Sequence, residues 1–326
     1  MNAVAKPTAS TPDPGSPRNR GGGMRISWGG EAPRAALREP RPSFLGSVGS
    51  EALKLARQGM LWAMLGLALF FFAMLTAALL QAGNIRDQLN QHPAGFLFNL
   101  YDIYTAIFDA GSGIFLLIVT ARLVGMEYSA GTIRVLLARG AGRIRLLLAK
   151  LTAVGLLGLV LLAGFLLLVS AAIYGVVVAW DGSFTRISSL PGTAWTDLGI
   201  VVLIMLTSMG VCILIGTAAA TLGRSLAFGV GAALAVFPID NFGTALLRVL
   251  NLLTGWHFWL DVSAYLLGPN LNALPVLMEK DHVAHAAFAS PLVTIDATHA
   301  WLVIAAWSLG LIALTVGLTW RRDVLQ

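Results

Sequence analysis

Few side chains in this sequence have the type and spacing that catalysis or ligand binding requires. Asp109 is the only acid in a long apolar stretch, and an ionisable residue in such a place is a candidate for substrate or proton binding unless it is hydrated near an interface. Pro238 and Asp240 interrupt a later apolar stretch. They indicate either a broken helix that lines a pathway or a helix that ends at the membrane interface. These three are the candidate pathway residues.

The sequence patterns of common enzymes are absent. The chain has no Gly-x-x-x-x-Gly-Lys-Ser/Thr segment, so it lacks the backbone cradle and the lysine with which ATPases hold nucleotide phosphates. Neither Gly-x-Ser-x-Gly nor His-Glu-x-x-His occurs. The single cysteine, Cys212, excludes an intramolecular disulfide and a multi-cysteine metal site. We therefore expect no catalytic residue, no metal site and no cofactor on this chain.

A segment between Met126 and Lys150 combines apolar and basic residues at helical spacing. This pattern is typical of helices that lie at a membrane interface, and Gly140 and Gly142 would divide such a helix in two. Attraction to anionic lipid, worth about 1 kcal/mol for each basic residue, explains the arginines equally well. The arginines are Arg134, Arg139, Arg143 and Arg145.

The elements that must position these residues belong to a membrane protein. Of the 326 residues, 57% are hydrophobic and 12% are charged, whereas soluble domains carry about 25% charged residues. The net charge of +6 does not indicate nucleic acid binding, because the basic residues flank apolar stretches instead of forming one water-facing surface. We expect a lipid bilayer as the solvent of most of the chain.

Six apolar stretches are long enough to cross a bilayer as helices, which takes about 20 residues. Residues 1–44, rich in Pro, Gly, Ser and Arg, are expected to form a disordered cytoplasmic tail, and residues 45–326 a six-span domain. An outer segment at about 247–296 is expected to be partly helical at the membrane surface. The predicted spans are 60–80, 103–124, 151–180, 198–223, 225–246 and 297–320.

The distribution of basic residues predicts the orientation. If the N-terminus is cytoplasmic, 18 of the 22 Lys and Arg residues fall on the cytoplasmic side of the predicted spans. Cytoplasmic flanks of membrane proteins carry an excess of Lys and Arg. We therefore expect both termini in the cytoplasm.

Several segments together resemble the permeases of type-2 ABC exporters. The sequence from Glu51 to Gln58 is similar to the amphipathic helix that precedes their first span, and Trp320 to Asp323 resembles their basic terminus. The order of these segments around six spans carries the resemblance, which covers residues 45–326. The segment between the second and third spans contributes Glu127, Gly131-Thr132, a leucine pair, Arg143 and Ala149-Lys150.

This resemblance implies an all-α integral membrane fold with six transmembrane helices, an amphipathic N-terminal helix and a cytoplasmic coupling helix between spans two and three. It also implies a permease subunit of an ATP-driven exporter in the bacterial inner membrane. A second copy or a homologous permease would complete the substrate path, and a separate ABC ATPase subunit would hold ATP and Mg. The residues implied in coupling to that ATPase are Glu127, Gly131, Thr132, Arg134, Arg139, Arg143 and Arg145.

Glu127 needs a partner, since a carboxylate at a helix end costs free energy unless it is solvated or paired. We expect that partner to be Arg122, Arg134 or a residue of the ATPase. Two other functions remain open. A lipid-modifying enzyme would require Asp109, Asp296 or His299 to meet near one interface, and an ion-coupled secondary transporter would require internal repeats and several buried ionisable residues.

Overall fold

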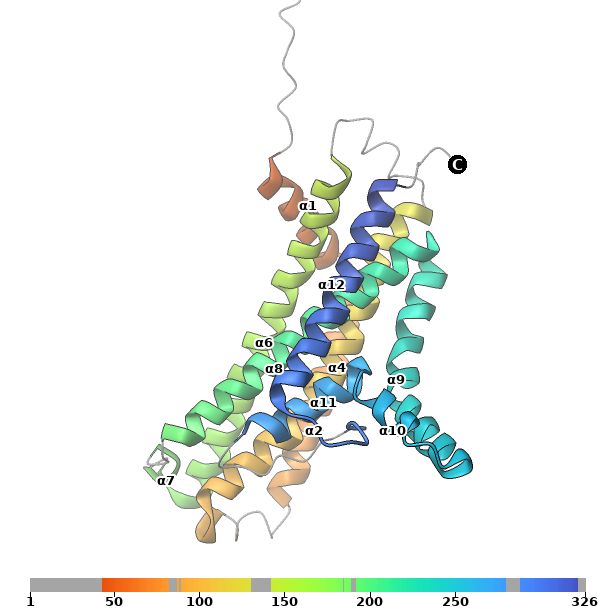
Figure 1. The fold of residues 1–326 in the computed structure, drawn as a ribbon. Helices are drawn as coiled ribbons and strands as arrows, with labels where there is room; N and C mark the ends of the chain where they lie inside the picture. Colours follow the sequence, from red (N-terminus) through yellow and green to blue (C-terminus); the bar gives the residue numbers. More distant parts are fainter. Residues whose placement is uncertain are drawn as a thin grey trace, which may run out of the picture. The chain divides into compact units, whose positions relative to one another are not determined.

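The computed structural model describes residues 43–81, 87, 89–129, 142–183, 185–188, 192–279 and 288–321. Within these ranges the regular elements are all helices, and no strand is present (Figure 1). The prediction of an all-α fold is therefore confirmed. The predicted tail lies outside the described residues up to residue 42, whereas its last two residues, Ser43 and Phe44, begin the first helix.

In the described part of the chain, five helices are long and apolar enough to cross a membrane. Their sequences, rich in Leu, Ala, Val and Phe, suit a bilayer, where a helix satisfies its backbone hydrogen bonds internally. The longest has 39 residues, or about 58 Å at 1.5 Å per residue, so its ends must project beyond a hydrocarbon core of about 30 Å. The five are α2 (Gly59–Gln81), α4 (Pro93–Ser129), α6 (Arg143–Asp181), α8 (Gly192–Gly223) and α12 (Ala297–Arg321).

The expected span at 225–246 lies in a broken helix, α9 (Leu226–Thr254), which contains Pro238. Figure 1 shows α9 changing direction along its length. Proline removes a backbone donor and its ring clashes with the preceding turn, which kinks a helix. The two apolar parts, Leu226–Val236 and Phe242–Thr254, are each shorter than a span. The structure thus supports five candidate spans and leaves the predicted number of six unconfirmed.

An amphipathic helix, α1 (Phe44–Ala56), precedes the first span and packs along α6. Its first turn is capped by Ser43, whose hydroxyl accepts a hydrogen bond from the Gly46 backbone N–H at 3.0 Å. The buried side of α1 carries Val48, Glu51 and Leu55. One charged residue therefore lies on the buried face of this helix and needs partners there.

Three short helices connect the longer ones. They are α7 (Thr185–Ser188), α10 (Phe258–Ser263) and α11 (Leu267–Met278). Helices α10 and α11 belong to the segment expected at 247–296. The first residues of that segment belong to α9, which continues to Thr254. α11 packs against α8, α9 and α12 and buries Leu274 completely. This segment is therefore partly built into the helical bundle, which the sequence did not predict.

Glycines allow the central helices to approach closely. A Cβ atom at Gly216 of α8 would stand 2.7 Å from the Leu117 carbonyl oxygen of α4, and one at Gly229 of α9 would stand 2.9 Å from the Ala220 Cα of α8. Small residues permit such backbone contacts between membrane helices. The three helices α4, α8 and α9 consequently form the tightly packed centre of the described residues.

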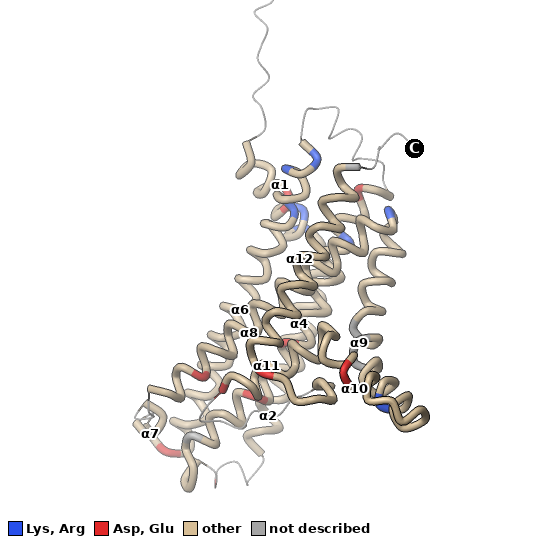
Figure 2. The backbone as a smooth tube through the Cα atoms, in the orientation of Figure 1, with Lys and Arg blue, Asp and Glu red and all other residues tan. Residues whose placement is uncertain are grey.

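The charges are distributed unevenly along the helices (Figure 2). Among the described residues, most Lys and Arg gather where α1, the first turns of α6 and the last turns of α12 lie, whereas Asp and Glu predominate toward the opposite ends of the helices. The structure thus collects in one region the basic residues that the sequence places around the spans.

Candidate functional site

A charge cluster joins three helices in this basic region. It consists of Glu51 and Lys54 from α1, Glu127 from the last turn of α4 and Lys150 from the start of α6. The Lys150 Nζ atom lies 2.7 Å from Glu127 Oε1 and 3.0 Å from Glu51 Oε2. One ammonium group thus bridges carboxylates from two other helices.

Lys54 adds a second positive charge to the cluster. Its Nζ atom lies 2.5 Å from Glu51 Oε1 and 3.6 Å from Glu127 Oε1. Partial burial lowers the pKa of Lys54, but the hydrogen bond and charge of Glu51, followed by those of Glu127, outweigh burial and raise that pKa above its usual value. The cluster therefore contains two positive and two negative charges that neutralise one another.

The bridging pair of the cluster is buried. The side chains of Glu51 and Lys150 are only 2% and 4% exposed, and Lys150 also donates a hydrogen bond to the Leu123 carbonyl oxygen at 3.3 Å. Removing one partner of a buried ion pair leaves the other charge without compensation, which typically costs about 3–5 kcal/mol. Each member of this cluster thus depends on the others.

The cluster lies at the base of the predicted coupling segment. Glu127 precedes residues 130–141, and Lys150 follows them in the third turn of α6. Beside it, the Ser129 hydroxyl accepts a hydrogen bond from the Leu226 backbone N–H at 3.1 Å, which ties the end of α4 to the start of α9. The helices that flank this segment are therefore bound to α1 and to α9.

The other predicted coupling residues are only partly described. Arg143 and Arg145 belong to the first turn of α6, where Arg143 is half-buried and Arg145 is exposed. The remaining four lie outside the described residues and stay predictions. They are Gly131, Thr132, Arg134 and Arg139.

The expected partner of Glu127 requires a correction. Arg122 does not pair with Glu127 but directs its Nη1 atom at Met60 Sδ, 2.9 Å away. Lys150 and Lys54 pair with Glu127 instead. The sequence offered one signal for this role, because Lys150 is the last charged residue before a long uncharged stretch and had no assigned partner.

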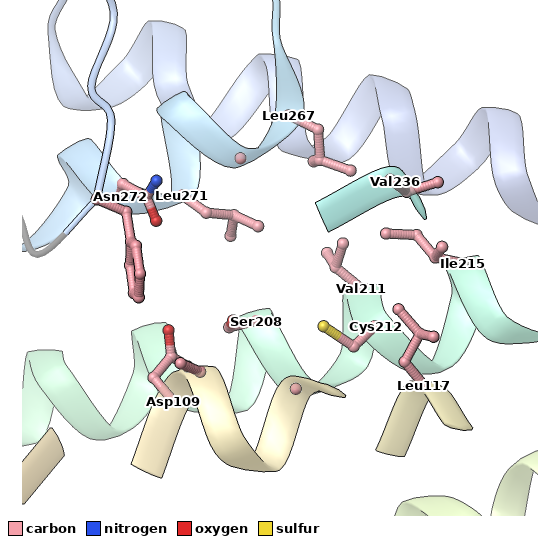
Figure 3. Close-up of a pocket in the computed structure, with 14 residues that line it drawn as sticks. Asp109, Leu117, Ser208, Val211, Cys212, Ile215, Val236, Leu267, Leu271 and Asn272 are labelled. Atoms are coloured by element: carbon pink, nitrogen blue, oxygen red, sulfur yellow. The ribbon is translucent and has the colours of Figure 1, made fainter. Parts of the chain in front are cut away.

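A small pocket of about 70 Å³ lies between α4, α8, α9 and α11 (Figure 3). Its polar lining comes from Asp109 of α4, Ser208 and Cys212 of α8 and Asn272 of α11, and Val236 of α9 also lines it. A cavity of this size and polarity has room for more than one water molecule or for a small polar group. The pocket thus brings together residues from elements that lie far apart in the sequence.

Among the residues that the structure describes, Asp109 supplies the only carboxylate that lines this pocket. The Ser208 side chain lies near the carboxylate, and Asp109 Oδ1 is buried without a hydrogen-bond partner among the described residues. Pro238 does not line the pocket, although it follows Val236 by two residues, and its role is to bend α9. The side chain of Asp240 is not among the side chains that the structure describes.

The residues expected for an enzymatic alternative have structural roles. Asp296 Oδ1 accepts a hydrogen bond from the His299 backbone N–H, and His299 Nε2 lies 2.9 Å from the Ala264 carbonyl oxygen. Neither residue lines the pocket of Asp109. Within the described ranges, no group of three or more His, Cys, Asp and Glu residues is placed to hold a metal ion.

A second group of acids lies beyond the pocket. The pKa of Glu279, at the end of α11, is raised to about 8. Burial is the main cause, and the negative charges of Asp102 on α4 and Asp197 on α8 add to it. Glu279 therefore lies close enough to Asp102 and to Asp197 for their negative charges to affect it.

The chain matches a known protein family. Residues 47–238, more than half of the chain, match the model described as ABC-2 family transporter protein. The matched region begins within α1 and ends at Pro238 of α9, so it contains the whole charge cluster and the α4 and α8 walls of the pocket. A comparison with curated proteins found no match.

Proposed function

Because this chain belongs to the ABC-2 family of transporter proteins, we propose that it is the permease subunit of an ATP-driven exporter. Its spans form the substrate path together with a second copy or a homologous permease. A separate ATPase subunit binds ATP and Mg and supplies the energy, since the chain itself has no phosphate-binding Gly-x-x-x-x-Gly-Lys-Ser/Thr segment.

The charge cluster is the observation that carries this proposal. Glu127 and Lys150 lie on the two helices that flank the segment between Met126 and Lys150, and they are 2.7 Å apart. A force applied to that segment by a partner subunit would reach α4 and α6 together, because the ion pair prevents them from moving independently. Glu51 would transmit the same displacement to α1.

The rigid helix α4 connects the cluster to the pocket. Asp109 precedes Glu127 by 18 residues, which is about 27 Å along a helix axis. Packed rigid helices with two arrangements can carry such a displacement over this distance. In the proposed cycle, closure of the ATPase subunits tilts α4 and α6 and changes the access to the pocket.

The proposal places the basic region in the cytoplasm of a bacterial cell, with the chain crossing the inner membrane. The excess of Lys and Arg around α1 and the start of α6 supports this orientation. The coupling segment then faces the compartment in which ATP is available.

The test is affinity purification of the tagged chain in mild detergent, with identification of the proteins that accompany it and an ATPase assay. We expect a nucleotide-binding subunit to copurify, and we expect Arg139→Glu/Arg143→Glu to abolish association or stimulated turnover. The matched control, Arg248→Glu/Lys280→Glu, makes the same change of charge outside the coupling segment and should have no such effect. Repeated purification without any ATPase would overturn the proposal.

A further inference from the structure

We propose that the pocket around Asp109 binds the positively charged head of an amphiphilic organic cation. This inference rests on the proposed permease function and names the chemical class of its substrate. The binding site consists of the Asp109 carboxylate, the Ser208 and Asn272 side chains and apolar walls from α4, α8, α9 and α11.

The unsatisfied carboxylate oxygen is the first argument. Asp109 forms no ion pair with any Lys, Arg or His of the described residues, and its Oδ1 atom is buried without a hydrogen-bond partner there. A buried polar group without a partner costs free energy, and the cost is larger for a charged group. An ammonium group in the pocket would supply both the missing hydrogen bond and the missing positive charge.

The chemical character of the walls is the second argument. Leu117, Val211, Ile215 and Leu271 make most of the lining apolar, whereas Ser208 lies beside Asp109 and Asn272 lies on the opposite wall (Figure 3). Ligand sites typically combine apolar walls with a few polar groups that orient the ligand. This combination suits a ligand with one charged group and an attached apolar chain.

The pocket is large enough for the head group of the ligand but not for its apolar chain. A volume of about 70 Å³ accommodates an ammonium head, whereas sites that enclose whole drug-sized ligands have about 300–1,000 Å³. Val236 and Phe288 line the pocket and are 37% and 38% exposed. The apolar chain of the ligand would pass beside these two side chains toward the surface of the helices.

The second group of acids supports a cationic ligand. Asp102 precedes Asp109 on α4 by seven residues, and Glu279 follows Asn272 of α11 by seven residues, about two helical turns in each case. The charge of Asp102 contributes to the raised pKa of Glu279, so the two acids lie near each other, at the same end of the pocket. Negative charge on Asp102, close to this end of the pocket, attracts cations and disfavours anions.

The experiment measures binding to the purified full-length chain in lipid nanodiscs without an ATPase. Three probes share an alkyl chain and differ in the head group: octylammonium, octanol and octanoate. The thermal unfolding midpoint is recorded against probe concentration, because a ligand that binds the folded state raises this midpoint in a saturable way. We expect octylammonium alone to give a saturable rise.

Two variants and a control test the assigned residue. Asp109→Asn should weaken octylammonium binding at least about tenfold, the usual effect of losing a charge-assisted hydrogen bond. Ala110→Leu, which adds bulk to the wall and keeps the carboxylate, should weaken it too. Asp261→Asn removes an exposed acid outside the pocket and should leave binding unchanged.

Equal responses to octanol or octanoate, or an unchanged response to octylammonium in both Asp109→Asn and Ala110→Leu, would overturn this inference. These outcomes concern the binding site alone, because the purification experiment tests the association with an ATPase separately. Loss of ATPase association with retained octylammonium binding would instead reject the proposed function and keep the site.

Discussion

Lys150 Nζ lies 2.7 Å from Glu127 Oε1, and this contact joins the helix before the coupling segment to the helix after it. The same ammonium group reaches Glu51 at 3.0 Å on α1, a residue 99 positions earlier in the chain. Because these contacts hold three helices together, the charge cluster stabilises the fold whether or not it takes part in coupling. The loss of Lys150 tests the contribution to stability, and the loss of the Glu127 charge tests the contribution to coupling.

Replacing Lys150 by Met should destabilise the folded chain strongly. The substitution leaves the buried Glu51 carboxylate with Lys54 alone and removes the nearer partner of Glu127. We expect a loss of about 3–5 kcal/mol in the free energy of unfolding, as for other broken buried ion pairs. Reversible unfolding in mixed micelles measures this loss. A double-mutant cycle with Glu51→Gln should show a coupling energy clearly different from zero, and additive losses would show that the two side chains do not interact.

Glu127→Gln should uncouple the ATPase more than it destabilises the chain. Lys150 keeps Glu51 as a partner when Glu127 loses its charge, so this change should cost less than the loss of Lys150, while the connection between α4 and α6 is weakened. We expect lower substrate-stimulated ATPase activity and lower transport, with a smaller fall in the unfolding midpoint than Lys150→Met causes. Unchanged stimulation and transport would reduce Glu127 to local pairing at the end of α4.

Gly216→Ala should destabilise the packing of α4 against α8. The new Cβ atom would stand 2.7 Å from the Leu117 carbonyl oxygen, so two helix backbones would have to separate. Overpacking of this kind costs about 1–3 kcal/mol, and the unfolding midpoint in detergent should fall. Gly210→Ala on the same helix is the matched control, because no atom lies within 4 Å of its added Cβ. Equal midpoints for the two variants would contradict the close contact.

The stability of the chain should fall as pH rises through the titration of Glu279. Its pKa in the folded chain is raised to about 8 from an ordinary value of 4.5, so the folded state holds this proton more tightly than the unfolded state does. The contribution of the protonated group is therefore complete below pH 4.5 and is lost as pH rises from there through about 8. Thermal unfolding across this range measures the effect. Glu279→Gln cannot ionise and should show a weaker fall, and a fall as steep as in the unmodified chain would exclude Glu279 as its cause.

The sequence alone was sufficient for the membrane character of the chain and for most of its helices. Apolar stretches of 20 residues or more have one stable solution in a bilayer, a helix that satisfies its own backbone, so α2, α4, α6, α8 and α12 could be predicted from local composition. The helix α4 extends beyond the predicted span, since it begins at Pro93, before residue 103. Polar turns at the end of a helix can lie outside the hydrocarbon core, and hydropathy does not detect them.

The tertiary structure decided which charges meet. Nothing local in the sequence pairs Glu51 with Lys150 or surrounds Asp109 with Ser208 and Asn272, because these contacts join helices that are distant along the chain. The burial of α11 was also invisible in its short apolar sequence, which suits a surface helix equally well. Composition determines whether a segment leaves water, but only the packing of helices against one another determines which buried charge finds a partner and which is left facing a pocket.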